Sequence, residues 1–167
     1  MPSSLAIAMT TLGERMVLAD ELFSYQPPAS TVPTSFIRRI DSMIDHISVG
    51  VSDLERSARF YEAALAPLGL SRLVTRPATV GFGKNYPEFW INLRAGMAPV
   101  AAGSGTHICL RAKATAHVDA FHAAALANGG RSDGGPGLRP HDRVKYYAAF
   151  VIDPDGNRIE AVTFPAE

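Results

Sequence analysis

An internal repeat is the feature that most constrains how this chain can fold. The segment HISVGVSDLERSARFYEAAL, which starts at His46, aligns without a gap on HICLRAKATAHVDAFHAAAL, which starts at His107. The two histidines coincide, and so do the apolar positions after them, such as Phe60 and Phe121. A repeat of this kind predicts two copies of one supersecondary unit. Each copy alone is too short to bury a sufficient core, so we expect the two to pack together.

Each copy has the pattern of a strand, a helix and further strands. Apolar residues recur at helical spacing in the first copy, at Leu54, Ala58, Tyr61 and Leu65. The segments GLSRLVT, ATVGFG and EFWINLR follow as strands. The second copy has a Gly-rich loop, NGGRSDGGPGLRPHD, with a poorly defined strand, then the strands VKYYAAFVI and RIEAVTF around the tight turn DPDGN. The sequence therefore predicts an α+β fold of two βαβββ modules whose sheets pair around a shared cleft.

The repeat sets the predicted domain boundaries. We expect one domain over residues 43–165, with modules at about 43–98 and 104–165. Residues 1–42 form an extension in which one amphipathic helix, TLGERMVLADELF, precedes the Pro/Ser/Thr-rich linker SYQPPASTVPTS. Two interpretations of this extension are open: it is a disordered segment that results from an upstream start, or it is an arm that clasps a second copy.

Composition excludes several classes of partner. The formal net charge is zero with Lys and Arg scattered, which argues against binding to nucleic acid or to an anionic membrane surface. No stretch reaches the roughly 18 apolar residues of a membrane-spanning helix. Cys109 is the only cysteine, so no internal disulfide can form. These features predict a cytoplasmic protein.

A charged residue in the last strand indicates a metal site. Glu160 lies in the apolar run RIEAVTF, where an unpaired carboxylate is costly. Aligning WINL with RIEA makes Asn92 the equivalent of Glu160, just as His46 is the equivalent of His107. If the two modules are related by a pseudo-two-fold axis, these four positions converge on the cleft. Two imidazoles and a carboxylate, from His46, His107 and Glu160, form the ligand set of an open divalent-metal site.

Other polar and aromatic residues are candidates for contact with a substrate. Alternation sends one of Tyr146 and Tyr147 toward the cleft, while Trp90 is a candidate for its wall. Asn92 can hydrogen-bond a substrate, and Arg143, beside the Gly-rich loop, can hold an anionic group. Packing, or a solvated loop for Arg143, is the alternative interpretation in each case.

Three segments resemble one known family, the vicinal oxygen chelate superfamily of glyoxalase I, bleomycin and fosfomycin resistance proteins, and extradiol dioxygenases. They are DHISVGVSDLERSARFYEAAL, THICLRAKATAHVDAFHAAAL and YYAAFVIDPDGNRIEAV. The resemblance covers about residues 43–165. It implies a cupped mixed sheet around a metal cleft, with Zn, Ni, Mn or Fe bound by His46, His107 and Glu160. It also implies that Glu160 can act as a base, and that the chain forms a homodimer, in some members with sites across the interface.

The resemblance leaves three functions open. The first is a metal-dependent lyase, isomerase or thiol transferase that acts on a small oxygen-chelating substrate. The second is an Fe(II) extradiol dioxygenase, which needs a further acid–base histidine near the metal. The third is a non-catalytic protein that sequesters a small molecule such as an antibiotic. Asn92 argues against a four-ligand glyoxalase I, because an amide is a weak ligand and no base.

Overall fold

The computed structural model describes residues 44–141 and 143–166. The predicted extension over residues 1–42, with its helix, its linker and its two alternative roles, lies outside the described residues. All elements below belong to the repeat region.

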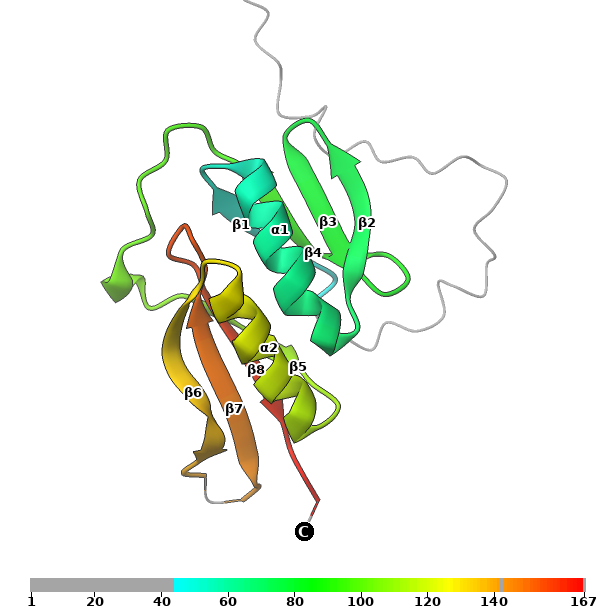
Figure 1. The fold of residues 1–167 in the computed structure, drawn as a ribbon, viewed down its shortest axis with the longest axis vertical. Helices are drawn as coiled ribbons and strands as arrows, with labels where there is room; N and C mark the ends of the chain where they lie inside the picture. The colour runs from blue at the N-terminus through cyan, green and yellow to red at the C-terminus, as the bar shows by residue number, and fades with distance from the viewer. Residues whose placement is uncertain (1–43, 142, 167) are drawn as a thin grey trace, which may run out of the picture. The chain divides into compact units, whose positions relative to one another are not determined.

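The first module has the predicted order of elements (Figure 1). Its sheet runs in the order β1-β4-β3-β2, with β1 parallel to β4 and the other pairs antiparallel. Its elements are β1 (Ile47–Val51), α1 (Leu54–Leu65), the short 3-10 helix η3 (Ala66–Leu68), β2 (Ser71–Arg76), β3 (Thr79–Gly83) and β4 (Pro87–Leu93).

The second module repeats this topology. Its sheet has the order β5-β8-β7-β6, again with only the first pair parallel. The predicted α+β fold of two βαβββ modules is therefore confirmed. The elements are η4 (Ala102–Ser104), β5 (His107–Arg111), α2 (Thr115–Ala127), β6 (Arg131–Arg139), β7 (Tyr146–Ile152) and β8 (Arg158–Thr163).

The poorly defined strand predicted in the Gly-rich segment is β6, and it takes up most of the stretch that we expected to be a loop. Its register against β7 shifts on both sides of Gly134, so the strand is bulged. Gly134 has a φ of +153°, and a Cβ there would lie 3.1 Å from the Phe150 ring. Glycine lowers strand propensity but permits bulges and close contacts, and pairing along β7 decides the outcome. The pairing of β6 with β7 cannot be predicted from the amino-acid composition of the segment alone.

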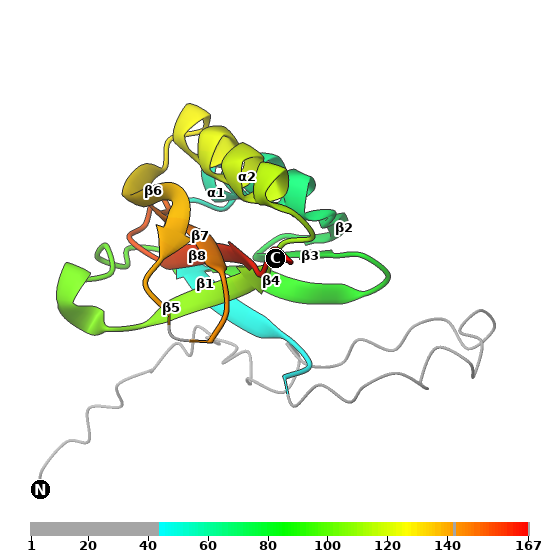
Figure 2. The same ribbon diagram turned by 90° about the horizontal axis from the view of Figure 1, so that it is seen from below.

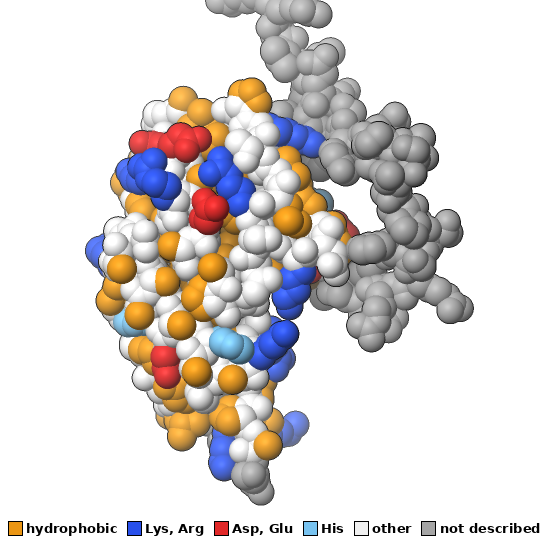
Figure 3. Space-filling model, turned by 45° about the vertical axis from the view of Figure 1, so that its right-hand side comes forward, with side chains coloured by type: hydrophobic (Ala, Val, Ile, Leu, Met, Phe, Trp, Pro, Cys, Tyr) orange, Lys and Arg blue, Asp and Glu red, His pale blue; other side chains and the backbone are white. Residues whose placement is uncertain are grey.

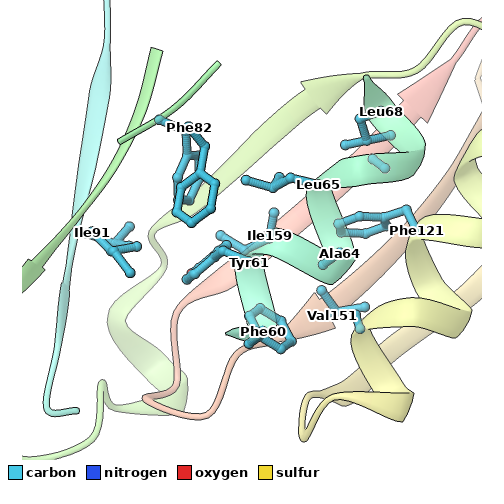
Figure 4. Close-up of a cluster of buried hydrophobic side chains, with 14 of the residues drawn as sticks. Phe60, Tyr61, Ala64, Leu65, Leu68, Phe82, Ile91, Phe121, Val151 and Ile159 are labelled. Carbon is cyan, nitrogen blue, oxygen red and sulfur yellow. The ribbon is translucent and has the colours of Figure 1, made fainter. Parts of the chain in front are cut away.

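Both helices cover the same side of the strands, and they pack against each other (Figure 2). The N-terminus of α1 is capped by Asp53, whose carboxylate accepts a hydrogen bond of 3.0 Å from the backbone of Arg56. Figure 4 shows side chains of both modules in one cluster, with Phe121 of α2 beside Ala64 of α1. Full burial of an aromatic side chain such as Phe121 contributes about 1.5–3 kcal/mol. The two modules therefore share one hydrophobic core.

Each sheet has an open face, defined here as the face opposite the helices. Side chains alternate along a strand, so the residues between the core positions line this face. In the first sheet they include Ser48 and Trp90, and in the second His107, Cys109 and Glu160. The polar residues of the predicted site therefore lie on the open faces.

The surface has no strong charge asymmetry on the side shown in Figure 3. Acidic and basic side chains lie next to each other there, and hydrophobic atoms are scattered in small groups. Among the described residues, no helix is long and apolar enough to cross a membrane.

Candidate functional site

Glu160 is the centre of the candidate site. Its side chain lies on the open face of the second sheet, yet the residue is only 2% exposed. One carboxylate oxygen, Oε1, accepts a hydrogen bond of 2.5 Å from the Tyr146 hydroxyl. The other, Oε2, lies 3.3 Å from His107 Nε2. A phenol and an imidazole thus contact the two oxygens of this buried carboxylate, while the metal predicted as its partner stays a prediction.

Strand register produces this arrangement. Cys109 of β5 lies directly opposite Glu160 of β8, and His107 lies opposite Arg158. Cys109 Sγ is 4.0 Å from the Tyr146 hydroxyl. Partial burial, and then the negative charge of Glu160, raise the pKa of Cys109 to about 12. Burial and the hydrogen bond to Glu160 also raise the pKa of Tyr146 far above its ordinary value, so both groups are protonated donors at neutral pH.

His46 is not part of this cluster. It lies just before β1, where its Nδ1 is 2.8 Å from Asp45 Oδ2 and its side chain is 44% exposed. Among residues 44–141 and 143–166, no three His, Cys, Asp or Glu side chains group closely enough to hold a metal ion. Of the three predicted ligands, the structure brings together His107 and Glu160 only.

The equivalence of Asn92 and Glu160 is corrected by the register of the two sheets. Ser48 pairs with Trp90 in the first sheet, and its repeat equivalent Cys109 pairs with Glu160 in the second. Trp90 therefore occupies the Glu160 position, and Asn92 lies two residues further along β4. A shift of two residues keeps every side chain on the same face of the sheet. The alternation of polar and apolar residues is therefore the same for Asn92 and Trp90 and could not show which of them is equivalent to Glu160.

The first sheet offers an aromatic platform at this position. The Trp90 ring lies on Gly81, where a Cβ would come within 2.8 Å of a ring carbon. The Arg76 guanidinium lies 5.9 Å from the centre of the same ring. Asn92 is tied to Thr79, whose hydroxyl donates a 2.6 Å hydrogen bond to Asn92 Oδ1. An indole is no metal ligand, so His46 is the one ligand that this module can add from the predicted set.

Two predicted substrate residues lie away from Glu160. Tyr147 faces the helix side of its sheet, where its hydroxyl donates a 2.8 Å hydrogen bond to Asp119 of α2. Tyr146 is thus the phenol that alternation sends to the open face. Arg143 is exposed in the loop between β6 and β7, and its backbone N–H donates to His141 Nδ1. The structure gives Tyr147 and Arg143 no contact with the cluster around Glu160.

A pocket of about 190 Å³ opens beside His107. Arg158 contributes to its wall, and its Nε lies 3.2 Å from Asp133 Oδ2. At this distance the two side chains form an ion pair, but the geometry gives Arg158 Nε no hydrogen bond. Sequence reasoning missed Arg158, although its two-residue spacing from Glu160 places it on the same face. The lining residues are Gly105, His107, Asp133, Phe150, Arg158 and Ile159.

The turn before β8 fixes this strand to the first module. Asp155, which is 3% exposed, accepts hydrogen bonds from the Ser52 backbone (3.0 Å) and hydroxyl (2.5 Å). It also accepts from Arg56 Nη2 (2.7 Å) and the Ser57 hydroxyl (2.9 Å). Burial alone would raise the pKa of Asp155, but these hydrogen bonds outweigh it and lower the pKa. The turn predicted from DPDGN is also a contact between modules.

A second aspartate of the turn makes a similar contact. Asp153 accepts a 2.7 Å hydrogen bond from the Tyr61 hydroxyl of α1. The Asn157 side-chain amide donates a hydrogen bond of 3.1 Å to the carbonyl of Gly50 in β1. Burial is the largest effect on Asp153 and raises its pKa. Glu160 therefore follows a turn that is anchored to β1 and α1.

The sequence pattern of the Glyoxalase/Bleomycin resistance protein/Dioxygenase superfamily matches residues 43–161. No protein of curated function matches the chain in sequence.

Several solved structures share the fold. A glyoxalase/bleomycin resistance protein from Albidiferax ferrireducens T118 is 37% identical over 74% of this chain and 100% of its own, with a TM-score of 0.64. A glyoxalase-related enzyme from Fulvimarina pelagi is 25% identical over 71% of this chain and 86% of its own, with a TM-score of 0.55. A glyoxalase I mutant from Zea mays is 22% identical over 70% of this chain and 45% of its own, with a TM-score of 0.56, a likeness in fold alone.

Proposed function

Because the chain belongs to the Glyoxalase/Bleomycin resistance protein/Dioxygenase superfamily, we propose that it is a divalent-metal-dependent enzyme acting on a small oxygen-chelating substrate. The expected reaction is that of a lyase, an isomerase or a thiol transferase. One observation carries the proposal: the buried Glu160 carboxylate meets His107 at 3.3 Å on an otherwise accessible strand face. A protein that only sequesters an apolar molecule has no need of this costly pair.

His107 and Glu160 fit a divalent cation. Glu160 is buried, and the groups that touch its oxygens are a neutral phenol and an imidazole, so an adjacent cation would stabilise it. Imidazole nitrogen and carboxylate oxygen together suit Zn, Ni, Mn or Fe. When bound, such an ion supplies Lewis-acid polarisation of a substrate oxygen.

The two oxygens of the Glu160 carboxylate have different neighbours, and we expect them to have different roles. Tyr146 donates to Oε1 and so fixes the plane of the Glu160 side chain. Oε2 remains on the side of His107. We expect Oε2 to accept a substrate proton during the reaction while the Tyr146 hydroxyl stays on Oε1. Cys109, protonated at neutral pH, adds no nucleophile.

The site needs a third ligand, and a second copy of the chain can supply it. His46 is exposed just before the edge strand β1, and His107 is 52% exposed at the start of the edge strand β5. The helices pack against each other, so no helix within residues 44–141 and 143–166 covers the open faces of the two sheets. In a two-fold dimer, the first sheet of one copy covers the second sheet of the other, and two identical sites result.

Two inactive variants can test this shared site. His46→Ala lacks the first-module ligand and Glu160→Gln lacks the carboxylate, so each alone should lose tightly bound metal. If the variants are coexpressed in equal amounts, half of the dimers are mixed, and each mixed dimer has one intact site. We expect about a quarter of the wild-type metal content in the mixture. A site within one chain would give none.

Metal content of the wild type is the primary test. The full-length chain, purified without a metal-binding tag, should hold close to one divalent ion per chain, and Glu160→Gln should hold far less. Tyr147→Phe is the matched control, because Tyr147 faces the other side of the sheet. A wild type that holds no metal and takes up none on titration refutes the proposal.

One observation favours the dioxygenase as a second candidate. The His141 ring stacks on Tyr146 with 5.9 Å between the ring centres, so an additional imidazole lies beside the residue that holds Glu160. An extradiol dioxygenase needs such an acid–base histidine. Iron in the purified protein, with oxygen uptake on catechols that His141→Ala abolishes, would establish this function instead.

A further inference from the structure

We infer that the pocket beside His107 binds a carboxylate of the substrate through Arg158, and that its occupant is a small planar acid, aromatic or conjugated. The place of this group in a reaction rests on the proposed metal site. The ability of the pocket to bind a carboxylate does not.

The pocket has the size and lining for such a ligand. Its volume of about 190 Å³ admits a single ring with a short substituent, not a nucleotide or a peptide. Phe150 is one lining residue, with the Arg139 guanidinium 5.3 Å from the centre of its ring, and charged groups are contributed by Arg158, Asp133 and His107. A flat apolar surface beside a guanidinium is suited to a planar molecule with an acidic end.

The ion pair between Arg158 and Asp133 leaves the two terminal amino groups of the Arg158 guanidinium available to a ligand. Its Nε lies toward Asp133, 3.2 Å from Oδ2, so the stem of the side chain is restrained. Its two terminal amino groups make no hydrogen bond to any described residue, and the side chain is 33% exposed. The ion pair with Asp133 restrains the guanidinium, and its two terminal amino groups form a fork that matches the two oxygens of a carboxylate.

The charge around the pocket favours an anion. Arg139 lies on the same sheet face and donates to the carbonyls of Gly135 and Ala148, so no carboxylate among the described residues neutralises it. Arg111 lies 4.2 Å from the centre of the Phe164 ring and has no ion pair within the described residues. Asp133 is balanced by Arg158. Glu160 adds a second carboxylate to this face, so Arg111, Arg139 and Arg158 exceed Asp133 and Glu160 by one positive charge, which attracts a negatively charged substrate.

The position of Arg158 links the pocket to the proposed reaction. Arg158 and His107 are direct neighbours on adjacent strands, with both side chains on the open face. Neighbouring strands of a sheet lie about 4.7–4.9 Å apart, so the two side chains start from adjacent positions on the sheet. A carboxylate on Arg158 therefore places the next atoms of the substrate beside His107 and Glu160. We infer a substrate whose metal-chelating oxygens lie adjacent to, or one bond removed from, its carboxylate carbon.

Benzoate is a suitable probe because it has the ring and the carboxylate but chelates metals poorly. Its binding to the full-length chain can be measured by calorimetry or NMR titration, both as purified and with EDTA present. We expect wild-type binding that survives EDTA, and at least about tenfold weaker binding of the neutral analogue benzamide. Arg158→Gln should weaken benzoate binding at least about tenfold, and Arg158→Lys by an intermediate factor, because lysine keeps the charge without the fork.

Arg111→Gln is the matched control: it removes an arginine from the same sheet face but outside the pocket, and should change binding less than about twofold. Absence of benzoate binding in the wild type overturns the inference. So does equal binding of benzoate and benzamide, a readout that does not depend on any variant folding. Glu160→Gln should still bind benzoate, so failure of the metal proposal leaves this result unchanged and the two failures are distinguishable.

Discussion

Asp155 in the second module accepts two hydrogen bonds from Ser52 in the first, at 3.0 Å from the backbone N–H and 2.5 Å from the hydroxyl. The two residues are 103 positions apart in the sequence. Ser52 lies between β1 and α1, and Asp155 lies in the turn that leads into β8. This contact connects the strand that follows His46 with the strand that carries Glu160, so the fold and the candidate site depend on the same turn.

Replacing Asp155 should therefore destabilise the whole domain. Asp155→Asn removes the charge that pairs with Arg56 and disturbs a buried network. We expect the free energy of unfolding to fall by about 2–4 kcal/mol, since one buried partner is lost while the others stay buried. Urea denaturation measures this. Glu62→Gln is the control: Glu62 is exposed and its pair with Arg72 is 3.8 Å long, so this change should alter stability by less than about 1 kcal/mol.

The same aspartate predicts how stability depends on pH. The pKa of Asp155 is lower in the folded state than in the unfolded chain, because hydrogen bonds stabilise its charged form. Its contribution is therefore complete above the unfolded pKa, near 4, and is lost as the pH falls through the lower folded value. Asp153 has the opposite sign: its raised pKa gives stability that is present at low pH and lost as the pH rises through the folded value.

Denaturation of wild type and Asp155→Asn between about pH 2 and pH 6 separates these effects. The difference in unfolding free energy between the two proteins should be largest near pH 6 and should shrink in acid. A difference that stays constant, or grows in acid, contradicts the assigned direction.

The sequence predicted the modules well because the repeat and the helical spacing are local signals. The alternation around Glu160 also predicted the open face correctly. Three features depended on contacts that local patterns do not contain. The Gly-rich segment forms the long strand β6 because it pairs with β7. The residue equivalent to Glu160 is Trp90 and not Asn92, a difference of two residues in register. Asp155 contacts Ser52, which is far from its own turn in the sequence.

Removing the Tyr146 hydroxyl should weaken metal binding. Tyr146→Phe deletes the 2.5 Å hydrogen bond to Glu160 Oε1 and frees the carboxylate to rotate. Partners of metal ligands contribute about 10–100-fold to affinity, so we expect a loss in this range by competition with a chelating dye. Tyr147→Phe loses a 2.8 Å hydrogen bond to Asp119 on the opposite face and serves as the control. Equal affinities of the two variants would show that Tyr146 does not position Glu160.

Filling the space under Trp90 should disturb the aromatic platform of the first sheet. In Gly81→Ala the new Cβ would lie 2.8 Å from one ring carbon of Trp90 and 2.9 Å from Pro87 Cβ, so the indole must shift. We expect a loss of about 1–3 kcal/mol in unfolding free energy. Trp90 is the only tryptophan, so a change in the fluorescence spectrum reports its displacement directly. Gly135→Ala is the control, because nothing lies within 4 Å of a Cβ there. An unchanged spectrum in Gly81→Ala would mean that the ring does not rest on this glycine.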